Sequence, residues 1–336
     1  MDSLHAEPQG ERQKPRYSNI PQNVIEIARK VERVTFDPVK HLRFEDPAKI
    51  TTLEEFGKGD VGISRNALTD PFSLFTEEAI QQMRAEIFSQ AILEKYYCPT
   101  SPTSGLTRGH CPKDASFIYA AWTCPEVLEI VSKVAGVELI PAVDYDIGHV
   151  NLSFTSTGEE TGIPPGEANS EATEFCESAF GWHTDSFPFV CVTMLSDCTN
   201  MVGGGTAIRT TNGQVLKARG PTLGTAVVMQ GRHIEHQATP AVGGPERISM
   251  VTSFRPKSPL IKDETMLRGI RNISNTSVLY MQYTEYKLDN LEDRVRDELR
   301  KLRKVKEAES GFDVGQIRDW LVEQKAFIDN MLLEVH

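Results

Sequence analysis

The chain contains 336 residues, enough for about two average domains or for one large domain with flanking elements. Apolar residues make up 39% and charged residues 25%, a globular composition that excludes the disordered and collagen-like classes. Because 36 basic residues stand against 47 acidic ones, the formal charge is −11, which argues against nucleic acid or an anionic membrane as partner and leaves a small molecule as the expected ligand.

Hydropathy and cysteine content bear on location. No apolar run approaches the ~20 residues required to cross a bilayer, and the first thirty residues lack the apolar segment of a signal peptide. We therefore expect a cytoplasmic protein with no membrane partner. The six cysteines form no CxxC pair and no dense cluster, so reduced thiols are expected rather than a zinc ribbon or a disulfide framework.

The first part of the chain is expected to be helical after a polar tail. Residues 1–20 show almost no apolar periodicity, which predicts a disordered tail. Apolar residues with helical spacing begin at Val24, and a second helix begins near Thr76, which can cap it. A third helix is predicted over Thr123–Val134. Residues 21–137 are thus predicted to form a mainly helical flank.

Residues 138–260 show a different sequence pattern, one that is typical of strands. Short runs with alternating or β-branched residues are divided by Gly, Pro and Asn clusters, a pattern typical of a sandwich or barrel. The predicted strands are Val143–Phe154, Phe187–Leu195, Gly205–Thr210, Gln214–Ala218, Gly224–Gln230, Ile234–Ala238 and Arg247–Arg255. Asn212 and Gly213 predict a hairpin turn between two of them. Residues 155–181, rich in Gly, Pro and Glu, are expected to be either a lid or a disordered insert.

Residues 261–336 return to helical periodicity. The apolar positions that form the first stripe are Leu288, Leu291, Val295, Leu299, Leu302 and Val305. Gly311 interrupts the pattern before a second amphipathic segment. A helical hairpin packed on the barrel is predicted, and a homodimer formed through these helices is the alternative.

The first chemical signal is an HxD sequence. Three of the eight histidines are followed two residues later by an acid, where about one is expected from composition, so the motif is weak alone. His5 begins one of them in the tail. His183 and Asp185 lie two apart in an extended segment, so both side chains leave the same face and can converge on one ion. An imidazole and a carboxylate, without a nearby cysteine ligand, favour an intermediate metal such as Fe(II) over structural zinc.

A later strand supplies a second histidine and an arginine. His236 completes two imidazoles and one carboxylate, which leave the opposite face of an ion open. His233, three residues earlier, would face the other side of the strand and follows a predicted turn, so His236 is the favoured ligand. Arg247 and Ser249 share one strand face further on. A guanidinium with a hydroxyl beside it can hold the distant carboxylate of a metal-chelating dicarboxylate cosubstrate.

These residues, in this order, resemble the Fe(II)/2-oxoglutarate-dependent dioxygenases. The family pattern is HxD, a distal His, and an RxS or lone Arg roughly ten residues on. The run GGGT ending at Thr206 is similar to the glycine-rich strand start of these barrels, and the likeness covers about residues 138–260. The runs MQGRHIEHQ, GGPERISMVTSFRPKS and RNALTDPFSLFTEEAI resemble a fungal secondary-metabolism branch that includes an aziridine-forming oxygenase acting on valine.

The resemblance implies a fold and a reaction. It implies an α+β protein with a double-stranded β-helix, a cupin-like jelly roll, flanked by helices, in one catalytic domain over residues 21–336. Fe(II), 2-oxoglutarate and O2 would oxidise an unactivated C–H of a small amino-acid-derived metabolite by hydroxylation, desaturation or ring closure. The implied metal ligands are His183, Asp185 and His236; the implied cosubstrate residues are Arg247, Ser249, Thr206 and Asn151; the substrate candidates are Arg255, Phe187 and Trp182.

Two other readings of the same residues stay open. A redox-silent cupin-like barrel could bind a metal or small ligand, but it has no use for Arg247 and Ser249. A zinc-dependent hydrolase could use two histidines and an aspartate to hold an activated water. It would require a placed general base, for which only Glu235 is close in sequence.

Overall fold

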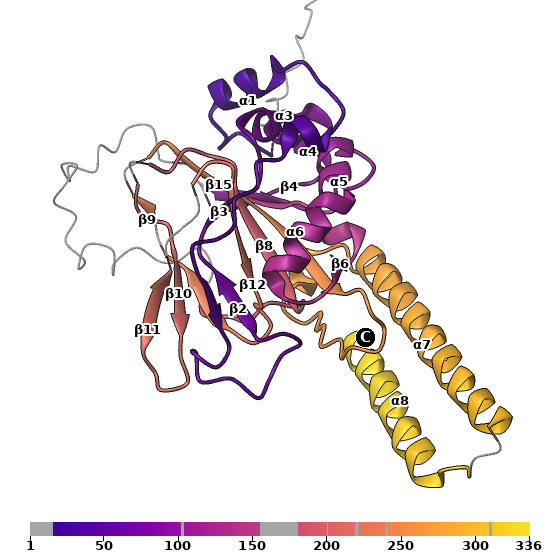
Figure 1. Ribbon diagram of the computed structural model, residues 1–336. Helices are drawn as coiled ribbons and strands as arrows, with labels where there is room; N and C mark the ends of the chain where they lie inside the picture. Colours follow the sequence, from indigo (N-terminus) through magenta and orange to yellow (C-terminus); the bar gives the residue numbers. More distant parts are fainter. Residues whose placement is uncertain are drawn as a thin grey trace, which may run out of the picture.

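The computed structural model describes residues 16–101, 104–154, 181–199, 201–218, 222–239, 241–242, 244–308 and 311–336. Most of the predicted tail and nearly all of segment 155–181 therefore lie outside the described residues. The fold is mixed α/β, with a large antiparallel sheet at its centre (Figure 1). Helices cover one face of this sheet, a smaller sheet lies on the other side, and a helical hairpin projects from the body.

The helices in the described residues are α1 (Gln22–Arg29), α2 (Pro38–His41), α3 (Glu77–Ile87), α4 (Gln90–Lys95), α5 (Ser116–Thr123), α6 (Pro125–Ala135), α7 (Thr276–Glu307) and α8 (Val314–Glu334), with 3-10 turns η1 (Asp144–Asp146) and η2 (Arg271–Ile273). Five of them, α2, α3, α4, α7 and α8, begin with a side-chain N-cap. The Thr76 hydroxyl accepts a hydrogen bond from the amide of Ala79, as expected for the N-cap of α3. Gly136 ends α6 with φ of 72°, a left-handed conformation that favours glycine.

Within the described residues, the large sheet has ten strands. They are β1 (Ile50–Thr52), β2 (Asn66–Thr69), β3 (Phe72–Ser73), β4 (Tyr97–Ser101), β5 (Ser104–Thr107), β6 (Leu139–Pro141), β7 (His149–Phe154), β8 (Phe189–Met194), β12 (Thr225–Met229) and β15 (Glu246–Pro256). The order is β1-β2-β12-β8-β15-β7-β5-β4, with β3 on β12 and β6 on β15. Strands β1 to β5 were not expected within 21–137, because two to five residues are too few to establish an alternating pattern.

A smaller sheet faces the large one. It has the order β11-β10-β13, from β11 (Val215–Ala218), β10 (Thr206–Arg209) and β13 (Glu235–Ala238), and the short strands β9 (Val202–Gly203) and β14 (Ala241–Val242) pair separately. The predicted hairpin at Asn212 and Gly213 joins β10 to β11, and Gly213 has φ of 83°. The predicted strand Val143–Phe154 is wrong in its first half, because η1 and a left-handed Gly148 occupy that part.

The two faces of the large sheet carry different side chains. Along β7, Val150, Leu152 and Phe154 belong to the core that also contains helices α3 to α6. The alternate residues, which begin with His149, therefore point toward the smaller sheet. A second core between the sheets joins residues such as Val190 on β8 to residues of the smaller sheet. The inner face of β7, β15 and β8 thus borders the space between the sheets.

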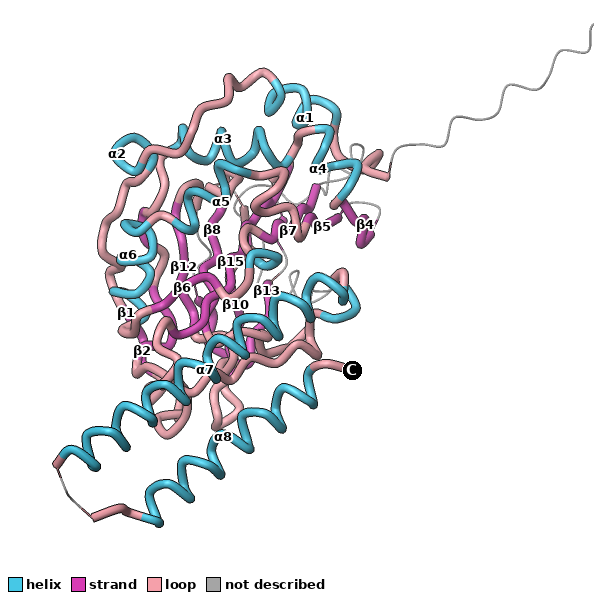
Figure 2. Tube along the Cα trace, turned by 90° about the vertical axis from the view of Figure 1, so that its right-hand side faces the viewer, coloured by secondary structure: helices cyan, strands magenta, loops and turns pink. Residues whose placement is uncertain are grey.

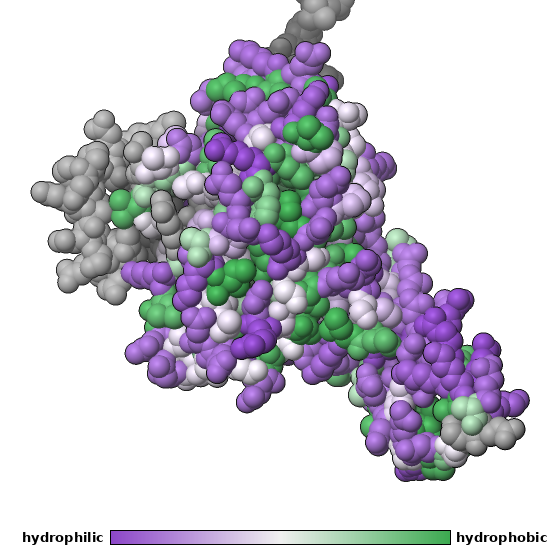
Figure 3. Space-filling model, in the orientation of Figure 1, coloured by the Kyte–Doolittle hydropathy of each residue, from purple (hydrophilic) through white to green (hydrophobic). Residues whose placement is uncertain are grey.

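Helices α7 and α8 form the predicted hairpin, and the face of α7 that is buried is not the apolar stripe. The buried positions of α7 include Asn290, Arg294 and Glu298, whereas Leu288 and Val295 of the apolar stripe are exposed. Arg294 can be buried in place of an apolar residue because its guanidinium pairs with Glu323 of α8 and donates to backbone carbonyls of the preceding loop. Figure 2 shows the hairpin reaching beyond the body of the protein. The side of the hairpin that is seen in Figure 3 is mainly hydrophilic.

None of the helices in the described ranges is both long enough and apolar enough to span a bilayer.

Candidate metal centre

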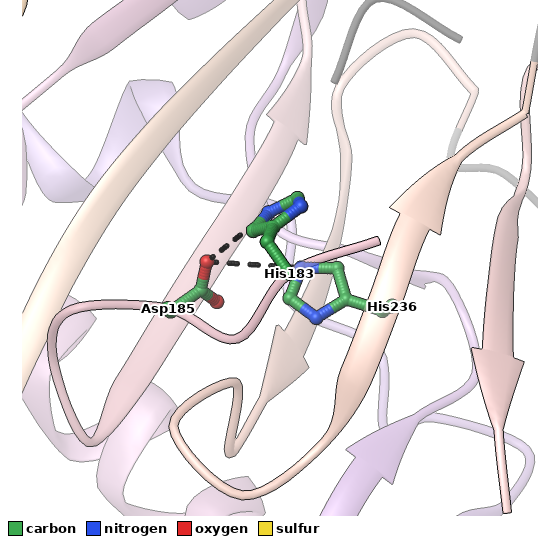
Figure 4. A group of neighbouring side chains, drawn as sticks. All are labelled: His183, Asp185 and His236. Carbon is green, nitrogen blue, oxygen red and sulfur yellow. Dashed lines mark ion pairs between the residues drawn. The ribbon is translucent and has the colours of Figure 1, made fainter. Parts of the chain in front are cut away.

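Three side chains from distant parts of the chain meet at one point (Figure 4). His183 precedes β8, Asp185 follows in the same loop, and His236 lies on β13. One ligand atom from each lies within 4.8 Å of the others. Oδ1 of Asp185 is 3.7 Å from Nε2 of each histidine, so the carboxylate is shared equally between the two imidazoles. Such spacing leaves room for one ion among the three groups.

Backbone hydrogen bonds fix these side chains. The amide of each histidine donates to the carbonyl of the other, at 3.0 and 2.9 Å, so His183 and His236 form a β-bridge. The amide of Asp185 donates to the carbonyl of Gly231 at 2.9 Å. Directly opposed residues of an antiparallel pair project on the same side, which explains why two histidines 53 residues apart present their rings together.

Each imidazole is also oriented through its second nitrogen. Nδ1 of His183 lies 2.8 Å from the carbonyl of Gly181, and Nδ1 of His236 lies 2.8 Å from the carbonyl of Ile234. A carbonyl only accepts, so each Nδ1 carries the proton and donates it. Nε2 on the side of Asp185 is then the unprotonated nitrogen, the form that coordinates a metal.

The carboxylate of Asp185 also indicates a metal site. Its Oδ2 is buried and has no hydrogen-bond partner within the described ranges. A buried carboxylate oxygen without donors is costly unless a cation compensates it. Gly231 lies so close that a β-carbon there would overlap Oδ2, so glycine is required for this approach. Two imidazole nitrogens and one carboxylate oxygen are a donor set that fits Fe(II), Mn(II) or Zn(II).

Arg247 and Ser249 lie on β15, on the inner face of the large sheet. Arg247 is opposite Ser153, and Ser249 is opposite Asn151 and Met194. Nη2 of Arg247 donates to the carbonyl of Gly204 at 3.3 Å, while its buried Nε has no hydrogen-bond partner in the described part of the chain. Burial lowers the pKa of this guanidinium from its ordinary value. The arginine therefore retains an unused donor inside the fold.

The remaining cosubstrate candidates occupy matching faces. Asn151 shares the inner face with Arg247 and Ser249 because it is directly opposite Ser249. Thr206 lies on β10 opposite Ala238, two residues from His236, and thus on the face of the smaller sheet that carries that histidine. The two sheets bring these candidates to opposite sides of one interior.

The three substrate candidates make other contacts. Trp182 stacks under Arg209 at 4.3 Å, and Arg209 pairs with Glu235 at 2.9 Å, on the face of β10 and β13 opposite to His236. Phe187 is fully buried in a cluster with residues of α7, which anchors the loop after Asp185. Arg255 lies over the ring of Tyr286 at 4.5 Å and donates to the carbonyl of Ala142.

His233 is turned away from the three-residue group. Its Nε2 lies 2.6 Å from Oε2 of Glu264, and this pairing is the main reason that the pKa of Glu264 falls to about 2. The group of possible ligands within the described ranges contains His236 and not His233. The turn predicted at Gly231 is present, since the amide of His233 donates to the carbonyl of Gln230.

Sequence reasoning missed two features of the interior. Gly231 carries no signal of its own, because its role arises only where two loops meet. Arg108 and His110 are buried and His149 is partly buried, and none of the three was proposed for any role. The alternation of His149 with Asn151 along one strand was the signal that could have found it.

Neither a protein-family model nor a curated protein matches this chain. Solved structures that are similar to it include AviO1 from Streptomyces viridochromogenes Tue57, with 12% identity over 63% of this chain and 97% of that one and a TM-score of 0.39. A Pseudomonas putida prolyl-4-hydroxylase has 15% identity over 54% and 88%, with a TM-score of 0.34. A 2OG-Fe(II) oxygenase family oxidoreductase from Burkholderia pseudomallei has 13% identity and a TM-score of 0.33, and the match spans 45% of this chain and 65% of that one, just under two thirds.

Proposed function

We propose that the protein is an Fe(II)/2-oxoglutarate-dependent oxygenase acting on a small metabolite. The observation that carries the proposal is the convergence of His183, Asp185 and His236, in which a buried carboxylate oxygen has no protein donor in the described residues. When bound, Fe(II) with 2-oxoglutarate and O2 supplies an oxidant for an unactivated C–H, with succinate and CO2 as coproducts. The two Nε2 atoms and the Asp185 carboxylate would hold the ion on one side and leave the other side open.

The arginine of β15 separates this function from the alternatives. Arg247 would receive the distant carboxylate of 2-oxoglutarate, since its buried Nε is an unused donor on the inner face. The hydroxyl of Ser249, two residues along the same face, and the amide of Asn151 opposite it would donate to the cosubstrate as well. A redox-silent binding barrel or a zinc hydrolase gives these three residues no task.

The strand order supports the finer fold assignment. The central part of the large sheet runs β12-β8-β15-β7, and the facing layer contains β11-β10-β13 with His183 bridged to His236 at its edge. The chain crosses between the two facing layers from β8 to β10, from β11 to β12, from β12 to β13 and from β13 to β15. Two facing antiparallel layers joined by such crossings are the arrangement of a jelly roll, so we assign a double-stranded β-helix.

The substrate class and compartment are further parts of the proposal. A small amino acid or a product derived from one is the proposed substrate, on the likeness of the sequence to the fungal secondary-metabolism branch. Hydroxylation, desaturation and ring closure, including aziridine formation, are all outcomes open to such a site. The cysteines of the described residues are free thiols, which supports a reducing compartment such as the cytoplasm.

An anaerobic titration tests the function. Purified apoprotein receives Fe(II) and then 2-oxoglutarate, and the visible charge-transfer band of the chelated keto acid is recorded. We expect a band that requires both additions and that needs at least tenfold more 2-oxoglutarate in Arg247→Ala, because a charge-assisted pair is lost. Arg209→Ala is the matched control, since this arginine lies on the opposite face. Metal binding without a band would instead favour a hydrolase or a binding barrel.

A further inference from the structure

A second polar cluster lies on the inner face of the large sheet, and the function proposed above assigns it no task. It consists of the buried pair Arg108 and Asp146 and of the partly buried His149. We propose that this cluster binds the charged end of the substrate, and that the substrate is an α-amino acid whose carboxylate pairs with Arg108 and whose ammonium is balanced by Asp146. The inference rests on the proposed oxygenase function and names the substrate class of that site.

The register of the strands places the cluster beside the cosubstrate residues. On β7, His149 is two residues from Asn151 and four from Ser153, so the three side chains share one face at steps of about 7 Å. Ser153 is opposite Arg247, and His149 is opposite Val251. Arg108 follows the last paired residue of β5, whose partner on β7 is Val150. A ligand at Arg108 would therefore lie further along the same interior than a cosubstrate at Arg247.

Many hydrogen-bonding groups of the cluster are unused. Only 4% of Arg108 is exposed, and its Nε and Nη1 find no hydrogen-bond partner in the described ranges. The same holds for Nε2 of the partly buried His149. Buried polar atoms are nearly always paired in native proteins, because each unpaired one costs free energy. A ligand carboxylate would satisfy the two arginine donors together.

The charge of the cluster selects a zwitterion. Nη2 of Arg108 lies 2.7 Å from Oδ1 of Asp146, and both side chains are almost fully buried, so the pair is neutral overall. Burial lowers the pKa of His149 to about 3, which keeps its ring uncharged near neutral pH. A lone carboxylate would add an uncompensated negative charge to a buried site. An amino acid carries an ammonium as well and leaves the local charge balanced.

Arg108 is held in a fixed position. Its guanidinium lies over the ring of Tyr145 at 5.5 Å. The hydroxyl of Tyr145 accepts a hydrogen bond from the amide of Asn275 at the start of α7, at 2.7 Å. Gly109 has φ of 76°, and a β-carbon there would overlap the ring of Tyr145. Only glycine therefore fits at position 109 beneath this ring. Binding would thus require little reordering of the arginine.

Thermal unfolding of the protein loaded with Mn(II) and 2-oxoglutarate tests this site. The probes are the twenty protein amino acids, the corresponding 2-hydroxy acids and the amino acid amides. We expect at least one amino acid to raise Tm, and its hydroxy acid and amide to raise Tm less. Arg108→Gln should weaken binding about 10- to 100-fold, as expected for the loss of a hydrogen bond to a charged group. Arg84→Gln, which alters another part-buried arginine paired with Glu246, is the control and should bind normally.

Two results would overturn the site. One is a panel in which no amino acid raises Tm, and the other is an amino acid that binds Arg108→Gln as tightly as the unchanged protein. If the 2-hydroxy acid bound as tightly as the amino acid, Asp146 would not be needed to balance an ammonium group. His149→Gln, which keeps a polar side chain, distinguishes failure to fold from loss of binding: it should retain the Tm of the ligand-free protein and lose part of the shift. The charge-transfer band of the Fe(II) complex is measured separately, so failure of the oxygenase function is seen independently.

The helical hairpin carries a second, independent inference. Leu288, Leu291, Val295, Leu299 and Leu302 lie at −7, −4, 0, +4 and +7 relative to Val295. At 100° per residue all five fall within about 40° of one line along α7. Leu288, Val295 and Leu299 are exposed, at 52%, 39% and 44%. We infer that this stripe packs against the same stripe of a second copy, antiparallel and with Val295 on the two-fold axis.

The symmetry of the stripe supports an antiparallel pair. Because the spacings are the same in both directions from Val295, a two-fold axis there brings Leu288 level with Leu302 of the partner and Leu291 level with Leu299. A closed two-fold interface of this kind uses one surface twice. The exposed apolar residues Leu321, Ile328 and Leu332 of α8 form a parallel stripe. Both stripes are displaced in the same sense from the contact between α7 and α8, which places them on one side of an antiparallel hairpin.

The charges along α7 are complementary under the same rotation. The exposed residues Glu285, Asp289, Glu292 and Asp293 precede Val295. The exposed residues Arg296, Arg300, Lys301, Arg303, Lys304 and Lys306 follow it. An antiparallel arrangement sets the acidic half of one helix against the basic half of the other, whereas a parallel arrangement would oppose like charges. The charge pattern therefore favours a second copy over an unrelated partner.

Sedimentation equilibrium at 5–50 µM, concentrations chosen to be about those of an ordinary micromolar dimer, tests the interface. We expect a dimer for the unchanged protein and a monomer for Val295→Arg, which puts two like charges together on the axis. Leu333→Arg is the matched control, because this exposed leucine lies on another side of α8, and it should remain dimeric. A monomeric unchanged protein, or a dimeric Val295→Arg, would overturn the inference. Equal Tm for both variants would show that the hairpin stays folded.

Discussion

Gly231 and Asp185 approach so closely that no other residue fits at position 231 without moving the carboxylate. A β-carbon on Gly231 would overlap Oδ2 of Asp185, whose own amide is bonded to the carbonyl of Gly231. We expect Gly231→Ala to fold and to lower metal affinity about 10- to 100-fold, the usual effect of disturbing a ligand's support. Isothermal titration with Mn(II) measures the change.

Gly311→Ala is the control for this substitution, since a β-carbon there meets nothing within 4 Å. Unchanged metal affinity in Gly231→Ala would mean that Asp185 is not held by this contact or does not bind the metal.

The two histidines near the start of β13 should respond differently to substitution. His236→Ala removes an imidazole that faces Asp185, so we expect metal binding and any metal-dependent oxidation to be abolished. His233→Ala removes only the partner of Glu264 and should leave metal affinity within about threefold, the scatter usual for a distant polar change. Mn(II) titration of both variants gives the comparison, and the reverse order of effects would reassign the ligand.

Regular spacing of residues along the chain predicted some elements of the fold and part of the site. Alternation identified the strand that became β15, and the spacing of His183 and Asp185 identified two residues that do lie together. Resemblance, more than periodicity, selected His236 and Arg247 from the other polar residues. The metal-binding role of the triad and the role of Arg247 remain predictions, which the titrations described here test.

The missed features depend on packing between distant segments. Arg108 gives no local signal, because its position beside His149 follows from the pairing of β5 with β7. The apolar stripe of α7 left two alternatives open, because amphipathicity reports that a helix has an apolar face, but not which partner covers it. Arg294 gives no signal of burial in the sequence, because the ion pair and carbonyl contacts that allow it to be buried form only in the folded protein.

The buried ion pair beneath α7 should be sensitive to removal of one partner. Nζ of Lys287 lies 2.9 Å from Oδ2 of Asp263, and each side chain is 3% exposed. Asp263→Ala would leave a buried ammonium uncompensated, and we expect a loss of about 3–5 kcal/mol in the free energy of unfolding. Urea denaturation measures it. Glu55→Ala breaks the exposed pair with Lys49, which solvent screens, and should cost far less than the loss of the buried pair. Equal losses in the two variants would contradict this expectation.

His110 should make the protein less stable in mild acid. Burial lowers the pKa of this fully buried histidine from 6.5 to about 4. Between these two pH values the unfolded chain binds a proton at this histidine and the folded chain does not, so the free energy of unfolding rises with pH from about 4 to 6.5. Above pH 6.5 neither state is protonated there, and the loss of stability is absent. The contribution is about 1.4 kcal/mol per pH unit within that window.

The variant His110→Phe isolates this contribution, because it replaces the ring with one that cannot be protonated. Urea denaturation at pH 5 and pH 7 gives the free energy of unfolding for both proteins. We expect the difference between the two pH values to be smaller in the variant by about 2 kcal/mol, since other titrating groups are common to both proteins and cancel. An identical pH dependence in the two proteins would mean that His110 is protonated, or accessible to water, in the folded state.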